Sequence, residues 1–235
     1  MRHNTTLGIL GLAMCVCAAM LWPHAATPAA ARTDEAAAEA GLLRVAMLRY
    51  GAERKSSICF SSNFLTVLEY ESGIRASRRF VDVDLASDDL FQFPFAIMTG
   101  EGTFTLSDDE ILRLNDYVTG GGFLLVSAGC SNGDWNESMS AALGRAFPDA
   151  ALKDLSLEHD VFHTVFDITG FESKKRGGPV RIRGIEVDGR LSLIYSPHGL
   201  NDTKNAPTDC CCCGANEILN AKYINANIVA YALTH

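Results

Sequence analysis

The sequence predicts an α/β domain in which a parallel sheet is covered by helices on both faces. Short apolar or alternating runs are typical of strands within such a sheet. They lie at 42–50, 80–85, 93–98 and 123–127. Segments with helical spacing separate several of these runs, and parallel strands need such crossover connections. The alternation of strands and helices therefore favours a parallel α/β sheet.

The first strand, LLRVAMLRY at 42–50, is followed by a predicted helix that Gly73 ends. The apolar positions of this helix recur at helical spacing, which predicts a face for packing. They are Phe64, Leu65, Leu68 and Tyr70.

The second helix has the clearest start signal in the chain. Ser107 stands three residues before Glu110, which is a capping box, and the amphipathic segment then runs through Val118. The glycines at 120–122 close it, and FLLVS at 123–127 follows as another buried strand. The order of helix, glycine turn and strand fits one repeating unit of the predicted sheet.

Beyond Cys130 the pattern is looser but still predicts three features. A helix is expected over 135–147, two strands within 180–195 around the turn Asp188-Gly189, and a closing helix over 223–233. Apolar residues with a period of 3.6 predict that the closing helix packs on the sheet. They are Ile224, Ile228, Val229 and Ala232.

Residues 1–40 have the composition of a secretory signal and an Ala-rich spacer. Arg2 and its polar neighbours precede an uncharged run from Leu7 to Trp22, and small residues lead up to Arg32. The run is shorter than the roughly 20 residues that span a bilayer, so we expect removal rather than a retained anchor. We expect one domain over 41–235, periplasmic or anchored facing the periplasm. Membrane contact would come through an uncleaved or lipidated N-terminus.

The charge balance narrows the function classes. The chain has 20 Lys and Arg against 28 Asp and Glu, which gives a formal net charge of -8. Nucleic-acid binding needs a basic face to neutralise phosphates, so this class is excluded. The sequence identifies no partner; export would make other cell-envelope proteins the candidates.

Several phrases together resemble the bacterial domain-of-unknown-function family 4159. They are RVAMLRYG, LFQFPFAIMTGEGTFTLSDDEILRLNDYVTGGGFLLVSAGCSN, FPDAALKDLSLEHDVFH, VDGRLSLIYSPHGLND and NIVAYALTH. The likeness covers nearly all of 43–235 and implies a flavodoxin-like sandwich similar to class I glutamine amidotransferase-like proteins. It supplies no activity. This chain has Ser127-Ala128-Gly129-Cys130 where many members have acidic residues and a His-Gly, so chemistry at those positions is not carried over.

The loops that leave the carboxyl ends of the strands hold the candidate site, because ligands of open parallel sheets bind there. The predicted ligand crevice consists of Gly100, Glu101, Ser127, Cys130, His198, Asn201 and Asp202. Within it, Cys130 is the candidate nucleophile, since amidotransferase-like enzymes carry a cysteine in a strand-to-helix elbow at about this place. His198 is its candidate base. Structural roles compete with both assignments, and Asn201 and Asp202 also fit a simple Asx turn.

A run of four cysteines, Cys210, Cys211, Cys212 and Cys213, is the most unusual feature. Disulfides are the favoured reading, because export leads to an oxidising compartment, with Cys130 the expected partner outside the run. One alternative is a thiolate-rich metal site on these four residues, with Cys130 and His198 as further ligands and zinc as its cofactor. The other is a run of reactive thiols.

Two functions follow from these features. The first is an exported, non-catalytic binding or assembly domain that uses the crevice. The second is an exported hydrolase or amidase that depends on cysteine or metal and uses Cys130 with His198. The proximity of partner groups to Cys130 distinguishes them.

Overall fold

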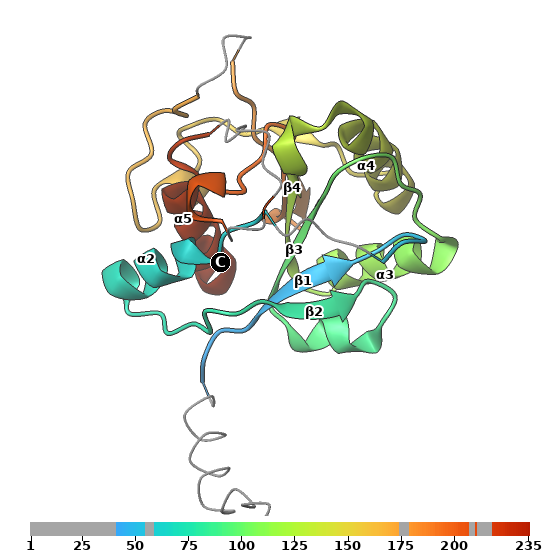
Figure 1. Ribbon diagram of the computed structural model, residues 1–235, viewed down its shortest axis with the longest axis horizontal. Helices are drawn as coiled ribbons and strands as arrows, with labels where there is room; N and C mark the ends of the chain where they lie inside the picture. Colours follow the sequence, from blue (N-terminus) through green and yellow to red (C-terminus); the bar gives the residue numbers. More distant parts are fainter. Residues whose placement is uncertain (1–40, 55–58, 174–178, 207–209, 211–217) are drawn as a thin grey trace, which may run out of the picture. The chain divides into compact units, whose positions relative to one another are not determined.

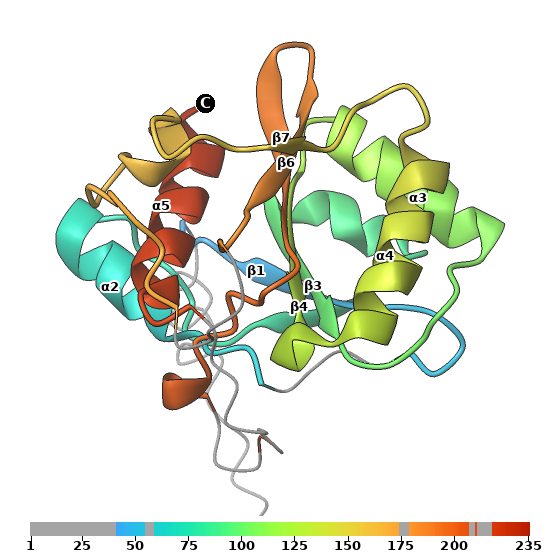
Figure 2. The same cartoon turned by 90° about the horizontal axis from the view of Figure 1, so that it is seen from above.

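The computed structural model describes residues 41–54, 59–173, 179–206, 210 and 218–235. Its centre is a seven-stranded sheet with the order β2-β1-β3-β4-β7-β6-β5 (Figures 1 and 2). The strands are β1 (Val45–Arg49), β2 (Val81–Asp84), β3 (Phe95–Gly100), β4 (Phe123–Ala128), β5 (Lys153–Asp154), β6 (Arg183–Val187) and β7 (Arg190–Ser196). The predicted α/β fold class is confirmed.

The sheet is mixed rather than wholly parallel. Strands β2, β1, β3, β4 and β7 are parallel, whereas β6 is antiparallel to β7 and β5 is antiparallel to β6. The predicted turn at Asp188-Gly189 explains the change of direction. Both residues have positive φ, 51° and 81°, and a two-residue turn of this kind reverses the chain where a parallel pair would need a long crossover.

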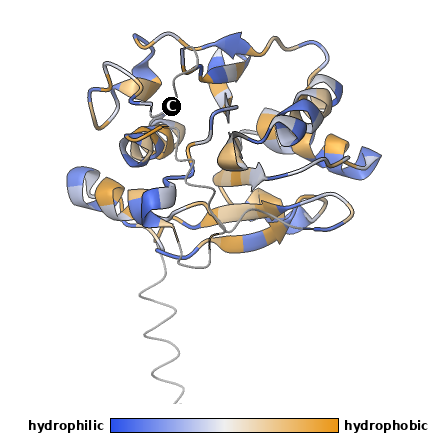
Figure 3. Ribbon diagram, turned by 45° about the horizontal axis from the view of Figure 1, so that its top comes forward, coloured by the Kyte–Doolittle hydropathy of each residue, from blue (hydrophilic) through white to orange (hydrophobic). Residues whose placement is uncertain are grey.

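Two layers of helices cover the sheet. Helices α2 (Asn63–Ser72) and α5 (Ala221–Thr234) pack on one face, and α3 (Asp108–Thr119) and α4 (Gly133–Ala146) pack on the other (Figure 2). Apolar segments lie along the strands between these layers (Figure 3). Strands β3 and β4 are buried along their whole length because helices cover both of their faces.

The helix boundaries follow the local signals. Ser107 Oγ accepts a hydrogen bond from Glu110 N at 3.2 Å, and Glu110 Oε2 accepts one from Ser107 N at 2.8 Å, so the capping box is confirmed. Gly73 ends α2 in the left-handed conformation with a φ of 73°.

The prediction that Tyr70 belongs to the apolar face is wrong, because its side chain is 86% exposed. It lies two residues beyond Leu68, which is about 200° around the helix.

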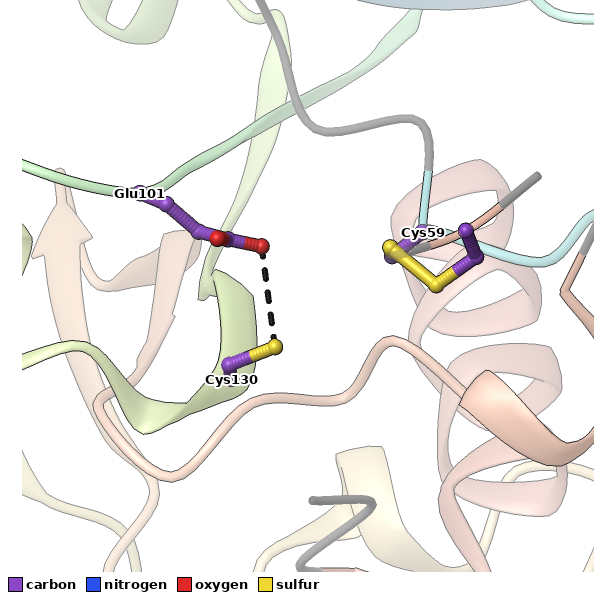
Figure 4. Close-up of a disulfide and its surroundings, with 4 residues drawn as sticks. Cys59, Glu101 and Cys130 are labelled. Carbon is purple, nitrogen blue, oxygen red and sulfur yellow. Dashed lines mark hydrogen bonds between the residues drawn. A yellow bond between two sulfur atoms is a disulfide. The ribbon is translucent and has the colours of Figure 1, made fainter. Parts of the chain in front are cut away.

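A disulfide joins Cys59, in the connection between β1 and α2, to Cys210, in the segment that leads to α5 (Figure 4). The expectation that Cys130 would be the partner is wrong. Ser61 explains the observed pairing: its N–H donates to Asn201 O at 2.8 Å and its Oγ donates to Asn205 O at 2.9 Å. These bonds hold the chain beside Cys59 against the chain that leads to Cys210. Cys211, Cys212 and Cys213 lie outside the described residues.

No helix in the described ranges is both long and apolar enough to cross a membrane.

Replacing Cys59 by Ser is expected to lower the free energy of unfolding by about 2–4 kcal/mol, because the disulfide restricts an unfolded chain across 151 residues. Denaturant unfolding without reductant measures the change. Cys130→Ser is the matched control, because Cys130 takes no part in this bond, and its stability should equal that of the unmodified chain. Equal stability of the Cys59→Ser chain and the control would contradict the pairing.

Candidate functional site

The candidate site lies at the carboxyl edge of the sheet. Strand β1 has β2 on one side and β3 on the other, so the direction of chain winding switches there. In open α/β sheets, ligands bind in the crevice beyond the strand ends at such a switch point. Glu101 follows β3 directly, Cys130 lies two residues after β4, and His198 lies two residues after β7. Three neighbouring strands therefore each deliver one candidate group to this edge.

Cys130 occupies a sharp turn between β4 and α4. Its backbone has φ 48° and ψ 29°, which is the left-handed region, inside the short 3-10 segment Gly129–Ser131. A residue with a Cβ in this conformation is strained by about 1–3 kcal/mol, and such strain gathers at functional sites. The side chain is half-buried. Cys130 thus lies between the end of a strand and the start of a helix, which is where a nucleophile elbow holds its reactive side chain.

The carboxylate of Glu101 faces the thiol of Cys130. Glu101 Oε1 and Cys130 Sγ are 3.6 Å apart, and the two side chains point toward one another (Figure 4). This distance allows an S–H to donate to the carboxylate, and therefore allows a proton to pass between the two groups.

Glycines allow the turn after β3 and the turn after β4 to lie in contact. A Cβ on Gly129 would lie 2.6 Å from Gly100 O and 2.7 Å from Glu101 Cγ. A Cβ on Gly100 would overlap Tyr50 Oη and the indole of Trp135. The backbones of the β3 and β4 turns are therefore in direct contact, and this contact sets the separation of Glu101 and Cys130.

Buried hydrogen bonds hold both turns in place. Trp135 Nε1 donates to Tyr50 Oη at 2.6 Å, and Tyr50 Oη donates to Thr99 O at 3.0 Å. Burial raises the pKa of Tyr50 well above its ordinary value, so it acts as a neutral donor. Asn132 Oδ1 accepts from Trp135 N at 2.9 Å and from Gly102 N at 3.1 Å. Asn132 thus caps α4 and ties it to the turn after β3.

Ser127 and Asn201 lie buried behind the edge, where they position the loop after β7. Ser127 Oγ donates to Asn201 Oδ1 at 2.5 Å and accepts from Leu200 N at 2.8 Å. Asn225 of α5 adds a third bond, from its Nδ2 to Leu200 O at 2.7 Å. These contacts give Ser127 and Asn201 a structural role.

Asp202 also lies within this packed loop. It is buried, and its carboxylate accepts two hydrogen bonds from Asn205 Nδ2, at 3.0 and 2.9 Å. Burial raises the pKa of Asp202 above its ordinary value, although the bond from Asn205 partly opposes the shift. Its φ of 51° is left-handed, a conformation that Asp and Asn tolerate better than most residues.

His198 lines a depression of about 540 Å³ on the side of the edge away from Glu101. The other lining residues are Leu152, Asp154, Arg181, Arg183 and Pro197. The polar contact described for Cys130 is with Glu101. The structure therefore offers the carboxylate of Glu101 as a group for exchange of the thiol proton.

Within the described ranges, no group of three or more His, Cys, Asp or Glu side chains is arranged to hold a metal ion. The sulfur of Cys210 is bonded to Cys59 in the disulfide, so it is not a thiolate ligand. The zinc hypothesis for Cys210 to Cys213 thus depends on three residues outside the described part of the chain.

Sequence reasoning missed several residues that build this edge. Tyr50, Trp135, Arg181 and Arg183 carried no local motif, and their roles depend on long-range contacts. Asn132 did carry a signal, since an Asn directly before the Gly133 helix start is a typical N-cap.

These features define an α/β domain with a cysteine elbow at the carboxyl edge of its sheet. The chain belongs to the family described as Domain of unknown function (DUF4159), whose model matches residues 44–233. The predicted family is confirmed. A comparison with curated proteins finds no match.

Replacing Gly129 by Ala is expected to lower the free energy of unfolding by about 1–3 kcal/mol, because the new methyl group collides with backbone at Gly100. Gly133→Ala is the matched control, since a Cβ there meets no atom within 4 Å. Urea unfolding of both variants measures the difference. If the Gly129 variant is as stable as the control, the two turns are not in contact.

Replacing Asp202 by Asn should raise the free energy of unfolding above that of the unmodified chain. This gain should be larger at neutral pH than in acid. The raised folded-state pKa means that the native chain holds this proton more tightly than the unfolded chain, whose value is near 3.8. The contribution of Asp202 to stability therefore falls as pH rises from about 3.8 through the folded pKa and stays reduced above it.

Urea unfolding from acid to neutral pH measures this effect. Asp188→Asn is the matched control, because Asp188 has the same φ of 51° but is exposed. A stability difference for Asp202→Asn that does not change with pH would contradict the burial argument.

Proposed function

We propose that this domain is a cysteine-dependent hydrolase that acts on an activated carbonyl group of a small molecule. One observation carries the proposal: Cys130 is held in a strained left-handed turn at the end of β4, with the carboxylate of Glu101 3.6 Å from its sulfur. The strained turn supports a functional role for Cys130, because backbone strain of this kind gathers at functional sites.

The reaction would proceed in two balanced steps. Glu101 accepts the S–H proton, and Cys130 Sγ attacks the carbonyl carbon to form a thioester while the leaving group departs with the proton from Glu101. Water then attacks the thioester, Glu101 takes a proton from that water, and the proton returns to sulfur as the acid product leaves. Water is the co-reactant, and both Cys130 and Glu101 end in their starting states.

Two further points support a catalytic role for Cys130. Cys130 takes no part in the disulfide of the cysteine run, which joins Cys210 to Cys59. The elbow also resembles in form the one in class I glutamine amidotransferase-like enzymes, so we propose a relationship of fold to that class. Because one fold supports many activities, that relationship does not choose the substrate.

A non-catalytic binding or assembly domain is the second candidate. The depression beside His198 favours it, because it is lined by charged side chains suited to holding a ligand. A binding domain would use the same edge without turnover.

We propose further that the domain is exported to the periplasm. The signal-like residues 1–40 support export, and the disulfide between Cys59 and Cys210 fits an oxidising compartment.

The hydrolase proposal predicts that the full chain hydrolyses p-nitrophenyl acetate and passes through an acetylated Cys130. Cys130→Ser should abolish the activity, and Glu101→Gln should lower it by about 100-fold or more, the scale of general acid–base catalysis. Glu137→Gln is the matched control, an exposed glutamate on α4, and should keep full activity. Peptide mapping locates the acetyl group.

Hydrolysis that survives Cys130→Ser would refute the proposal. Absence of both hydrolysis and acetylation would favour the binding domain.

A further inference from the structure

The depression beside His198 is lined by more positive than negative side chains. We call it the arginine depression, lined by Leu152, Asp154, Arg181, Arg183, Pro197 and His198. Its lining carries two guanidinium groups and one carboxylate, which leaves an excess of one positive charge. The whole chain has a formal charge of -8. A local positive surface on an acidic protein attracts anions to one place and repels them elsewhere.

The two guanidinium groups are held in position by neighbouring oxygens. Arg183 Nη2 donates to Leu152 O at 3.1 Å, and its Nε is 3.5 Å from Asp154 Oδ1. Arg181 Nη1 donates to Asp154 Oδ2 at 3.0 Å. Each guanidinium has five N–H donors, so these contacts leave donors for a further acceptor. The planar fork of donors matches the two oxygens of a carboxylate or phosphate.

The arginine depression lies on the same sheet edge as Cys130. In the antiparallel pair, Arg183 is opposite Tyr195, and in the parallel pair Tyr195 is opposite Val126 of β4. Strand β7 therefore separates β4 from β6. Two strand spacings correspond to about 10 Å, which is the length of a small organic molecule.

The loop after β7 forms the wall between the two places and is fixed to α4. Asn136 Nδ2 donates to Pro197 O at 2.9 Å, and Tyr195 Oη donates to Asn136 Oδ1 at 2.5 Å. Asn136 thus fixes the loop that carries His198, and this loop follows β7, the strand between β4, which leads to Cys130, and β6, which carries Arg183. On the other side of Cys130, the carboxylate of Glu101 would repel an anion. The charges therefore orient an anionic molecule with its acidic end toward the arginines.

We propose that the arginine depression is an oxyanion subsite that binds the carboxylate or phosphate group of a small molecule whose carbonyl end reaches Cys130. The identity of this molecule as a substrate rests on the proposed function. Anion binding itself does not, because it depends on Arg181 and Arg183 alone.

Direct titration tests the subsite in the full chain carrying Cys130→Ser. Inorganic phosphate and succinate are added in separate titrations, and binding is followed by calorimetry and by amide NMR shifts. The anion with the lower Kd identifies the preferred oxyanion. Arg181→Gln should weaken binding about tenfold or more, the effect of losing one charge-assisted hydrogen bond. Arg181 is the safer site to alter, because its side chain is 62% exposed and its described contact is with Asp154.

Arg113→Gln is the matched control. Like Arg181, Arg113 pairs with one aspartate, Asp88, but neither of these two residues lines the arginine depression. This variant should bind as the parent does. Failure of both anions to bind at millimolar concentration, or equal weakening by Arg113→Gln and Arg181→Gln, would overturn the subsite.

Alkylation rates in the chain that keeps Cys130 connect the subsite to the thiol. The measured quantity is the rate at which a maleimide with a hexanoate tail modifies Cys130, divided by the rate for N-ethylmaleimide. This ratio should be higher in the chain that keeps Arg181 than in the Arg181→Gln chain. An identical ratio in both chains would overturn the link between the two places. If neither reagent modifies Cys130, the proposed function fails while the anion titration still decides the subsite.

Discussion

The close contact between the turns after β3 and β4 is the constraint on which the candidate site depends. Gly129 lies against Gly100 O with no room for a Cβ, and Gly100 lies against Tyr50 and Trp135. Because both backbones are fixed there, the residues that follow them, Glu101 and Cys130, are held within 3.6 Å. The strain at Cys130 persists because the surrounding packing leaves the turn no alternative.

The rest of the fold supports this edge from both sides. On one face, α4 begins at the Asn132 cap, which also binds the turn after β3. On the other face, Ser127 and Asn225 hold the loop after β7. The disulfide between Cys59 and Cys210 joins two further segments at this edge. These long-range polar contacts in the described part of the chain thus position the loops at the strand ends.

Sequence patterns predicted the elements better than the site. Capping at Ser107, the turn at Asp188 and the period of the closing helix are local signals, so the chain alone reveals them. Tyr70 is aromatic, but it lies about 200° around the helix from Leu68, so the helix period and not the residue type accounts for its exposure. The partner of Cys210 and the neighbour of Cys130 depend on loops brought together across many residues. Residue type alone predicted a disulfide between Cys130 and the cysteine run, but Cys210 of the run is bonded to Cys59. Residue type also predicted His198 as the base beside Cys130, and the carboxylate of Glu101, which it did not predict in that role, lies 3.6 Å from the thiol.

The central claim is that Cys130 and Glu101 form one proton-exchanging unit. The most direct test is the rate of Cys130 alkylation by iodoacetamide as a function of pH, in the unmodified chain and in Glu101→Gln. Because the carboxylate of Glu101 lies 3.6 Å from the sulfur, the account predicts that Glu101→Gln changes how the alkylation rate depends on pH. Profiles that superimpose in both chains would contradict it.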